Sequence, residues 1–417
     1  MSAPSASGTV QNGPRDHAAD WRQRPARLTF PYPVPRTPVT LDAYRDLFQT
    51  PPDLVYLDHA ATGVLGTHVT DAVGDYLAGR AGRVPGRSPN NYPADLERVD
   101  RARARAAALV GARAEAVCVV PHTSAGLGLV AGGLDWRPGD RVAAPACEFP
   151  ANVLPWRALA ARGVELDLVP HHEGTVSVDD VADALTPQTR VVAVSAVQFL
   201  SGFRADLAGL ADLCRQRGAY LVVDAIQAVG AVRVDIDGVD LLATGGHKWL
   251  GAMQGAGVAV VSDRLLDRLE PARGWLNGPV DWDDFEATTD ALHPDATRFH
   301  TGTYPTAAVY ALDAAVGAML AVGPDAIEAA VLANAAALAD GLERLGYTRY
   351  GEPGPPRSGI VTVRADRPEA LHAHLAERGV TASVRSRLVR FAPHAHTRPH
   401  DIDRTLAAVA EFAPVAA

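Results

Sequence analysis

The sequence predicts an α/β protein in which a mostly parallel sheet lies between helices. From about residue 51, short β-branched runs alternate with helical patterns, which is typical of β-α-β connections. These runs are almost wholly apolar, as expected of strands buried on both faces. After about residue 300, long Ala-rich helices alternate with a few short strands. We therefore expect a large domain over 51–300 and a smaller α+β domain over 301–417.

The strands expected in the large domain follow one another closely along the chain. They are VCVV (117–120), RVAA (141–144), VELDLV (164–169), RVVAVS (190–195), AYLVVD (219–224), LLAT (241–244) and GVAVV (257–261). Helices are expected near 124–132 and 151–162. Ligands of such sheets bind beyond the carboxyl ends of the strands, so the residues that follow each strand are the first candidates for a site.

The two ends of the chain have a different character. The first 50 residues are rich in Pro, Ser and Arg and predict an extended, partly disordered arm. The C-terminal region predicts helices near 305–321 and 325–345, a strand at 359–363, a helix at 368–378, a strand at 388–392 and a last helix.

Composition excludes several classes of protein. Apolar and charged contents of 47% and 21% are ordinary globular values, and a net charge of -9 provides no positive field for nucleic acid. No stretch approaches the ~20 consecutive apolar residues of a membrane span, and the N-terminus lacks the features of a secretory signal. The three scattered cysteines form neither a disulfide framework nor a zinc spacing. We expect a cytoplasmic protein without a metal, nucleic-acid or membrane partner.

Lys248 is the only lysine in a chain with 39 lysine and arginine residues. Arginine cannot form an imine at ordinary pH, because its guanidinium stays protonated and delocalised. Lys248 lies in ATGGHKWLGAMQGAG (243–257), directly after an expected strand. The glycines on both sides allow the backbone to approach a ligand closely.

Asp224 ends the expected strand AYLVVD. A lysine amine and a strand-end carboxylate in one cleft are the groups that pyridoxal phosphate needs: the lysine bonds its aldehyde, and the carboxylate keeps its ring nitrogen protonated. The sequence therefore predicts a pyridoxal-phosphate enzyme with Lys248 and Asp224 as catalytic residues.

Thr123 and Ser124 follow the strand VCVV and open an expected helix. Unpaired N–H groups and the positive dipole end favour an anion there, and the hydroxyls add donors. The same pair could instead be a Ser/Thr N-cap without a ligand. The residues alone leave a phosphate site and a plain cap as alternatives.

These motifs resemble the class V aminotransferase family of fold-type I pyridoxal-phosphate enzymes, which includes cysteine desulfurases, selenocysteine lyases and isopenicillin-N-epimerase-like proteins. The resemblance covers about residues 54–412. Eight motifs occur in the family order: YLDHAATG (56–63), HTSAG (122–126), CEFPAN (147–152), VQFLSG (197–202), VDAIQAVG (223–230), GGHKWLG (245–251), RFHTGT (298–303) and VRFAPH (389–394). It implies a homodimer with active sites at the subunit interface.

The resemblance also implies individual roles. Lys248 would be the Schiff-base lysine and Asp224 the partner of the pyridine nitrogen. Gln227 would hydrogen-bond the phenolic oxygen of the cofactor, and His247 would help to hold its phosphate. Further cofactor contacts are implied for Thr123, Ser124, Phe149, Gln198 and Thr303, and substrate contacts for Arg390, Asn152 and His59.

Two cofactor positions depart from the family pattern. Many relatives carry a phosphate-binding serine three residues before the lysine, where this chain has Gly245. Thr244 is one replacement, and Thr303 of a neighbouring subunit is another. At the position of Phe149, cysteine desulfurases have a histidine, so this chain keeps an aromatic face but loses the titratable group.

The cysteine pattern also departs from that of desulfurases. Those enzymes carry a late, mobile cysteine that accepts the substrate sulfur, whereas no cysteine follows Cys214 in this chain. The segment GVTASVRSRLVRF (379–391) lacks a loop to hold one. Cys147 lies beside Glu148, near the expected cofactor site, but at no known nucleophile position.

Arg390 matches the family arginine that clamps an amino-acid α-carboxylate, for which the bidentate guanidinium is suited. Arg385 and Arg387 are weaker candidates for a second carboxylate. Arg298 could order a dimer-facing loop or reach the substrate. No metal is expected from His394, His396 and His400, because no carboxylate or cysteine is spaced to join them.

The predicted chemistry begins with Lys248 removing a proton from Cα of an amino acid. Three outcomes are open: loss of a group from Cβ, as in a C–S or C–Se lyase without a catalytic cysteine; transamination; and racemisation or epimerisation. The resemblance favours the lyase. Two rivals are a nucleotide-binding Rossmann protein, although no GxGxxG follows the early strands, and a non-catalytic scaffold that binds pyridoxal phosphate.

Overall fold

The computed structural model describes residues 39–412, so most of the arm predicted over 1–50 lies outside the described residues. Its last part contains the short helix α1 (Leu41–Arg45), which is capped by the Thr40 side chain. The described residues all fall in one unit, and the predicted division near residue 300 stays a prediction.

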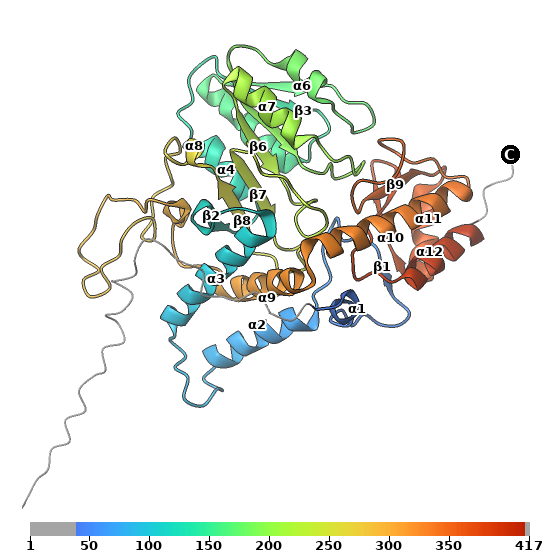
Figure 1. The fold of residues 1–417 in the computed structure, drawn as a ribbon, viewed down its shortest axis with the longest axis horizontal. Coiled ribbons are helices and arrows are strands. Elements are labelled where there is room, and N and C mark those ends of the chain that lie inside the picture. The colour runs from blue at the N-terminus through green and yellow to red at the C-terminus, as the bar shows by residue number, and fades with distance from the viewer. Residues whose placement is uncertain (1–38, 413–417) are drawn as a thin grey trace, which may run out of the picture. The chain divides into compact units, whose positions relative to one another are not determined.

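Seven strands form the main sheet in the order β2-β8-β7-β6-β5-β3-β4 (Figure 1). Their bounds are β2 (Val117–Val120), β3 (Arg141–Pro145), β4 (Glu165–Val169), β5 (Thr189–Ser195), β6 (Tyr220–Asp224), β7 (Leu241–Gly245) and β8 (Gly257–Val261). Strands β3 to β7 run parallel, whereas β8 is antiparallel to both β7 and β2. The mostly parallel sheet predicted from the sequence is therefore confirmed.

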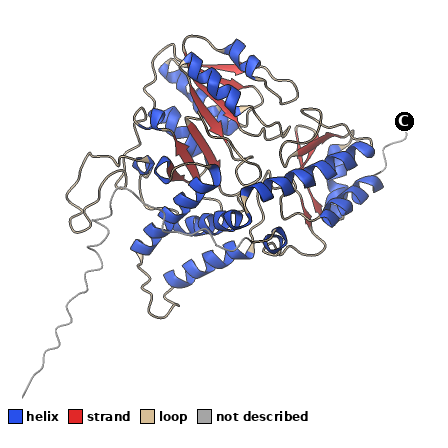
Figure 2. Cartoon of the chain, in the orientation of Figure 1, coloured by secondary structure: helices blue, strands red, loops and turns tan. Residues whose placement is uncertain are grey.

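Helices cover both faces of this sheet (Figure 2). Successive side chains of a strand point to opposite faces, and Leu241 and Leu242 accordingly belong to different hydrophobic clusters. The cluster of Leu242 includes α3 (Tyr92–Val110) and α7 (Leu207–Arg217), while that of Leu241 includes α4 (Thr123–Gly133). A short helix, α6 (Val178–Ala184), precedes β5.

The helix predicted over 151–162 is broken in the structure. A 3-10 turn at Pro150–Asn152 leads into α5 (Leu154–Ala158), and a second 3-10 turn covers Leu159–Arg162. Pro150 and Pro155 each lie at the start of a segment, because proline has no N–H to donate and is tolerated only in a first turn.

The helix α9 (Thr306–Val322) packs against α2 (Thr67–Arg80) and α3. Its fully buried Asp313 accepts hydrogen bonds from three arginines of α3: Arg98, Arg101 and Arg105. Three guanidinium partners compensate for the burial of the carboxylate, so this cluster joins the two helices.

Among residues 39–412, no single helix is long and apolar enough to cross a membrane. Helices α9 and α10 (Pro324–Arg344) meet that criterion only when taken as a pair, and the chain bends by 86° between them. The apolar side chains of α9, such as Val309 and Leu312, are buried in the core.

The C-terminal elements form a separate small sheet with its own core. Strand β12 (Leu388–Phe391) lies between β11 (Ser383–Arg385) and β9 (Val361–Arg364), antiparallel to both. Helices α10, α11 (Pro368–Glu377) and α12 (Pro399–Glu411) pack around it (Figure 1). The strands and helices expected in this region are therefore present.

An early segment of the chain joins this C-terminal core. Strand β1 (Val55–Tyr56) pairs in parallel with β10 (Val380–Thr381), and Leu57 is buried beside Phe391 in the same hydrophobic cluster. Asp58 and Ala392 form an isolated bridge. The segment then runs to Gly63, whose N–H donates to the carbonyl of His247 at 2.8 Å.

Candidate active site

A cavity of about 370 Å³ lies at the carboxyl ends of the parallel strands. The register pairs Ser195 with Asp224 and Asp224 with Ala243, so the ends of β5, β6 and β7 meet at this edge. The cavity is lined by Ala60, Ala61, His122, Thr123, Ser124, Phe149, Ala151, Phe199, Asp224, Ile226, Gln227, His247, Lys248, Arg385 and Arg390. Eight of the twelve candidate residues from the sequence are among them.

Lys248 follows β7 in a stretch of turns and reaches the cavity with most of its side chain covered. Burial lowers the pKa of its amine to about 8, and the charges of Arg390 and Arg385 act in the same direction, against Asp224 and Asp58. Its Nζ lies 5.6 Å from the centroid of the Phe149 ring. About a tenth of the amine is therefore neutral at pH 7, and able to act as a nucleophile, a far larger fraction than for an unperturbed lysine.

Asp224 is buried at the end of β6. Burial raises the pKa of its carboxyl to about 6, against the opposing effects of the Ile226 N–H, 3.0 Å from Oδ1, and of Lys248. The group is ionised above that pH and can form an ion pair with a protonated ring nitrogen.

The start of α4 offers an unused buried donor to the cavity. Thr123 is 4% exposed, and its Oγ1 has no hydrogen-bond partner among the described residues. The N-cap is His122, whose Nδ1 accepts from the Ala125 N–H at 3.1 Å. Neither Thr123 nor Ser124 is therefore the cap, which leaves both hydroxyls beside a helix N-terminus that favours an anion. A phosphate group fits these residues.

Gly245 and His247 complete this end of the cavity. A Cβ at Gly245 would lie 3.1 Å from the His247 Nδ1 and 3.3 Å from Cδ1 of Ile226, so the ring occupies the space of a side chain at 245. Burial lowers the pKa of His247, and the charges of Lys248 and His122 act in the same direction. Thr244 does not reach the cavity: it is fully buried, and its Oγ1 lies 3.3 Å from the Gly245 carbonyl.

Gln227 lines the cavity and is held from two sides. Its Nε2 donates to the Ala60 carbonyl at 2.9 Å, and its Oε1 accepts from the indole of Trp249 at 2.7 Å. An amide nitrogen has two hydrogens, so a second N–H is available for an acceptor on a ligand.

Arg390 is 2% exposed and rigidly held. Its Nη1 donates to the Phe199 carbonyl at 2.8 Å, and its Nη2 donates to Asp58 Oδ1 at 3.2 Å. Asp58 also accepts from Ser383 Oγ. The Nε of Arg390 is buried without a partner among the described residues, so the guanidinium retains donors for an anionic ligand.

The structure does not bring His59 to the cavity, although its motif lies beside lining residues. Its ring is 1% exposed, with Nδ1 2.8 Å from the Ala392 carbonyl and Nε2 3.0 Å from Nε2 of His396. His394 lies in the same group, 2.9 Å from the Trp249 carbonyl. These histidines support the backbone behind the lysine.

Asn152, Gln198 and Thr303 also lie outside the cavity lining of this chain. Asn152 is fully buried and accepts from the Trp156 indole at 3.2 Å. Gln198 bonds the Cys147 carbonyl and the N–H groups of its own turn. Thr303 is exposed. Membership of a motif does not reveal which residues line the cavity and which pack behind its lining.

Asp58 and Glu148 have roles near the site that the sequence did not indicate. Asp58 fixes Arg390, as described above. Glu148 is buried and accepts from Ser195 through both the backbone N–H and the hydroxyl. Burial raises its pKa to about 7, and the charge of nearby Asp224 acts in the same direction. Their positions directly before or within the motifs were the only available signals.

The three cysteines do not line the cavity. Cys118 and Cys214 are buried, and Cys147 is partly buried. Burial raises the pKa of Cys147 to about 12, as does the charge of Glu148. A thiol that stays protonated at neutral pH is a poor nucleophile.

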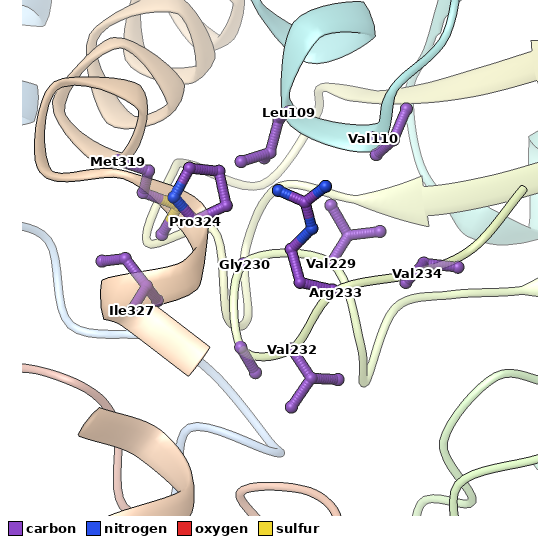
Figure 3. A pocket seen from close by; sticks show the side chains of 11 residues that line it. Leu109, Val110, Val229, Gly230, Val232, Arg233, Val234, Met319, Pro324 and Ile327 are labelled. Atoms are coloured by element: carbon purple, nitrogen blue, oxygen red, sulfur yellow. The ribbon is translucent and has the colours of Figure 1, made fainter. Parts of the chain in front are cut away.

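A second hollow, of about 20 Å³, lies near the start of α10 (Figure 3). Figure 3 shows Leu109, Met319 and Ile327 around it, and Arg233 is the one charged lining residue. This volume suits about one water molecule and is too small for a cofactor or an amino acid.

The chain is similar in sequence to known proteins. The family model described as aminotransferase class-V matches residues 55–386. An uncharacterized aminotransferase, YcbU, of Bacillus subtilis (strain 168) is 26% identical over 372 residues, which cover 88% of this chain and 97% of that protein. A cysteine desulfurase of Escherichia coli (strain SE11) is 32% identical over 283 residues, covering 66% of this chain and 69% of that enzyme.

Solved structures share the fold at lower identity. A mutant of C-DES with glycine covalently linked to its PLP cofactor superposes with a TM-score of 0.82 at 22% identity, over 88% of this chain and 99% of that chain. A cysteine desulfurase from Thermococcus onnurineus NA1 gives a TM-score of 0.77 at 23% identity, over 86% and 94%. The fold is that of fold-type I pyridoxal-phosphate enzymes.

The chain belongs to the class-V aminotransferase family. Pyridoxal phosphate is its cofactor. The amine of Lys248, the carboxylate of Asp224 and the start of α4 line one cavity, and they are the groups that would bond its aldehyde, pair with its ring nitrogen and hold its phosphate.

Proposed function

We propose that this enzyme is a C–S or C–Se lyase that releases the sulfur or selenium of an amino acid by β-elimination, without a catalytic cysteine. The proposal depends on the hairpin of β11 and β12. Arg385 pairs with Leu388, so only Ser386 and Arg387 connect the strands, and no loop is present to carry a sulfur-accepting thiol. Sulfur must then leave on a substrate fragment.

The residues of the cavity supply the required steps. Bound pyridoxal phosphate delocalises the electrons left on Cα when its proton is removed. Lys248 has the position and the lowered pKa of a base for that proton. Arg390 orients the α-carboxylate through its unused N–H groups. Phe149 and Phe199, whose rings meet edge to face at 5.3 Å, provide an apolar wall.

The reaction is balanced without an oxidant or reductant. The Cα–H bond breaks and its proton passes to Lys248. The Cβ–S bond then breaks, and its electron pair leaves with the sulfur as a thiolate or, from a disulfide substrate, a persulfide. Addition of one water converts the remaining three-carbon fragment to pyruvate and ammonia.

Relatives support this choice. A C-DES structure described as a cystine C–S lyase in complex with its reaction product, cysteine persulfide, superposes with a TM-score of 0.80 at 22% identity, over 87% of this chain and 99% of that chain. The cysteine desulfurase relative also acts, by its name, on a sulfur amino acid.

Transamination is the second candidate, because YcbU matches this chain over nearly its whole length and is described as an uncharacterized aminotransferase. Epimerisation and a scaffold role remain formal alternatives to both. The products distinguish these four possibilities. A lyase gives pyruvate with released sulfur or selenium, and an aminotransferase gives a keto acid with the carbon skeleton intact. An epimerase causes a loss of optical rotation, and a scaffold gives none of these results.

The proposal includes a homodimer in the cytoplasm. Thr303 is exposed and lies away from the cavity of its own chain, as expected if it contributes to the site of a second subunit. The three cysteines are free thiols, which suits a reducing compartment.

The test is a product assay on the enzyme saturated with pyridoxal phosphate. Cystine, cysteine, selenocysteine and a panel of common amino acids are supplied, and pyruvate, keto acids, released sulfur and selenium, and optical rotation are measured. We expect pyruvate with persulfide, sulfide or selenide from at least one sulfur or selenium substrate. The triple variant C118A/C147A/C214A should retain this activity, whereas Lys248→Ala should lose it. Loss of turnover in the folded triple variant would contradict the cysteine-free mechanism.

A further inference from the structure

We propose that the preferred substrate carries a second carboxylate, on the part of the molecule that leaves with the sulfur, and that Arg385 binds it. This inference deepens the proposed function and rests on it. The substrate class is therefore a disulfide or thioether amino acid with two separated carboxylates.

The first observation is the unpaired charge of Arg385. The residue is exposed and lines the cavity. Its Nη1 donates to the Val384 carbonyl at 2.8 Å, and in the described part of the chain no carboxylate oxygen lies within 4.0 Å of its guanidinium. An arginine at the solvent side of a cavity, without a carboxylate partner, is a ready site for an anion.

The second observation is the surplus of positive charge around the cavity. Arg385 acts electrostatically on both Lys248 and Arg390, and after burial its charge is among the causes that lower their pKa values. The opposing carboxylates are Asp224, near the lysine, and Asp58, which is bonded to Arg390. A ligand with one carboxylate would satisfy Arg390 and leave Arg385 without a counter-charge.

The third observation is the strained turn that holds Arg385. Ser386 and Arg387 have φ angles of 49° and 64°, in the left-handed region that favours glycine or asparagine. Two-residue turns with positive φ at both positions match the twist of a hairpin. Because the turn is so short, Arg385 stays paired with Leu388 at the end of β11. The strand therefore fixes the backbone of Arg385, which a longer loop would not do.

The different burial of Arg390 and Arg385 indicates which carboxylate of the substrate each arginine would bind. Arg390 is buried and lines the cavity, its Nε has no partner among the described residues, and it suits the α-carboxylate next to the reacting carbon. Arg385 faces solvent and suits a group farther from the lysine. A carboxylate on the leaving thiol meets this requirement, since the leaving group extends away from Cβ.

Kinetics with two substrates test the assignment. Cystine has the second carboxylate, whereas S-(ethylthio)cysteine has the same disulfide and lacks it. Arg385→Gln should raise KM for cystine about tenfold, as expected for loss of a hydrogen bond between charged groups, with kcat within about twofold. The KM for S-(ethylthio)cysteine should not change. Arg217→Gln, an exposed arginine at the opposite edge of the sheet, is the control and should leave both substrates unaffected.

An equal rise of KM for both substrates would overturn the proposal, because it would place Arg385 on the shared α-carboxylate or on the cofactor. An unchanged KM for cystine would overturn it as well.

Binding without turnover separates this inference from the proposed function. 2,7-Diaminosuberate is a carbon analogue of cystine without a C–S bond, and 2-aminooctanoate lacks its second carboxylate. By calorimetry on the holoenzyme, the wild type should bind the dicarboxylate about tenfold more tightly, and Arg385→Gln should abolish this preference. Absence of a preference in the wild type contradicts the second-carboxylate site. If the wild type prefers the dicarboxylate but eliminates no substrate, the proposed lyase activity is contradicted and the second-carboxylate site is not.

Discussion

The reactivity of Lys248 depends on the groups that surround it. Burial lowers the pKa of its amine to about 8, and two arginines add to the effect. Only the neutral amine attacks an aldehyde. The protein without cofactor should therefore take up pyridoxal phosphate at a rate that levels off above pH 8 and falls by about tenfold per pH unit below it.

This rate is measured from the visible absorption that appears on mixing. Asp224→Asn removes a negative charge that raises the lysine pKa, so its midpoint should lie at lower pH. A rate that stays constant between pH 6 and 8 would show that the amine is not the titrating group.

The Thr123 hydroxyl gives a second prediction at the scale of single residues. Because Oγ1 is buried without a partner in residues 39–412, the hydroxyl should contribute nothing to stability until a ligand binds. Thr123→Val should weaken pyridoxal-phosphate binding about tenfold, the value of a hydrogen bond to a charged group. The free energy of unfolding without cofactor should be unchanged or higher.

Thr405→Val is the matched control. Its buried hydroxyl donates to the Asp401 carbonyl at 2.8 Å, so this variant should lose about 1 kcal/mol of stability with and without cofactor, and keep its affinity. Equal destabilisation of both threonine variants without cofactor would refute a ligand-directed role for Thr123.

At the scale of elements, the turn that carries the lysine packs without clearance on the segment after β1. A Cβ at Gly63 would lie 2.0 Å from the Lys248 carbonyl oxygen. Gly63→Ala should therefore displace the backbone of Lys248, lower the melting temperature by several degrees and weaken cofactor binding.

Gly74 lies in α2 with nothing within 4 Å of an added Cβ. Gly74→Ala should raise stability by about 0.5–1 kcal/mol, because alanine favours a helix, and should not alter cofactor affinity. The two variants are compared by thermal unfolding and by titration with pyridoxal phosphate. Normal affinity in Gly63→Ala would mean that the lysine turn adapts freely.

Helices and strands were predicted correctly from the sequence where the local residue pattern determines them. The runs at 117–120 and 219–224 became strands within one residue of their expected bounds, because a strand buried on both faces is apolar at nearly every position. The antiparallel direction of β8 and the pairing of β1 with β10 depend on contacts between distant parts of the chain, which local patterns do not encode.

The same limit applies to the site. Lys248 and Asp224 were expected in one cleft because each ends or follows a strand and strand ends share one edge, and both line the cavity. His59 was expected at the substrate, but its ring turns toward His396, and motif position does not reveal side-chain direction. Arg385 was predicted as a weaker candidate, whereas only coordinates could show that its guanidinium bonds the Val384 carbonyl and no carboxylate of the described residues.

At the scale of the whole molecule, a group of buried histidines links stability to pH. Burial lowers the pKa of His59 to about 3 and that of His394 to about 4, and it lowers that of His396 well below its usual value. Arg45 and His68 also face His396 and act in the same direction. Since the unfolded chain binds these protons near pH 6.5 and the folded chain does not, stability falls as pH drops below 6.5.

His396→Phe preserves the stacking on Phe48, whose ring lies 3.8 Å away, and removes one titrating group. The wild type should lose about 1.4 kcal/mol relative to this variant for each pH unit below 6.5. Urea unfolding at pH 8, 6 and 5 measures the difference. A difference that does not vary with pH would show that His396 is protonated in the folded protein or that its pKa is unshifted.

The stretch 55–63 has a consequence for motion. Its first residues are hydrogen-bonded to the C-terminal core through β10 and Ala392. Its last residue, Gly63, donates to the carbonyl of His247. Asp58, between these two ends, accepts a hydrogen bond from Arg390. A displacement of the C-terminal elements would therefore act, through these few residues, on the turn that carries Lys248 and on the guanidinium of Arg390. The positions of Lys248 and Arg390 are therefore coupled through this stretch. Insertion of one residue within 55–63 should change the distance between the two side chains without altering either side chain.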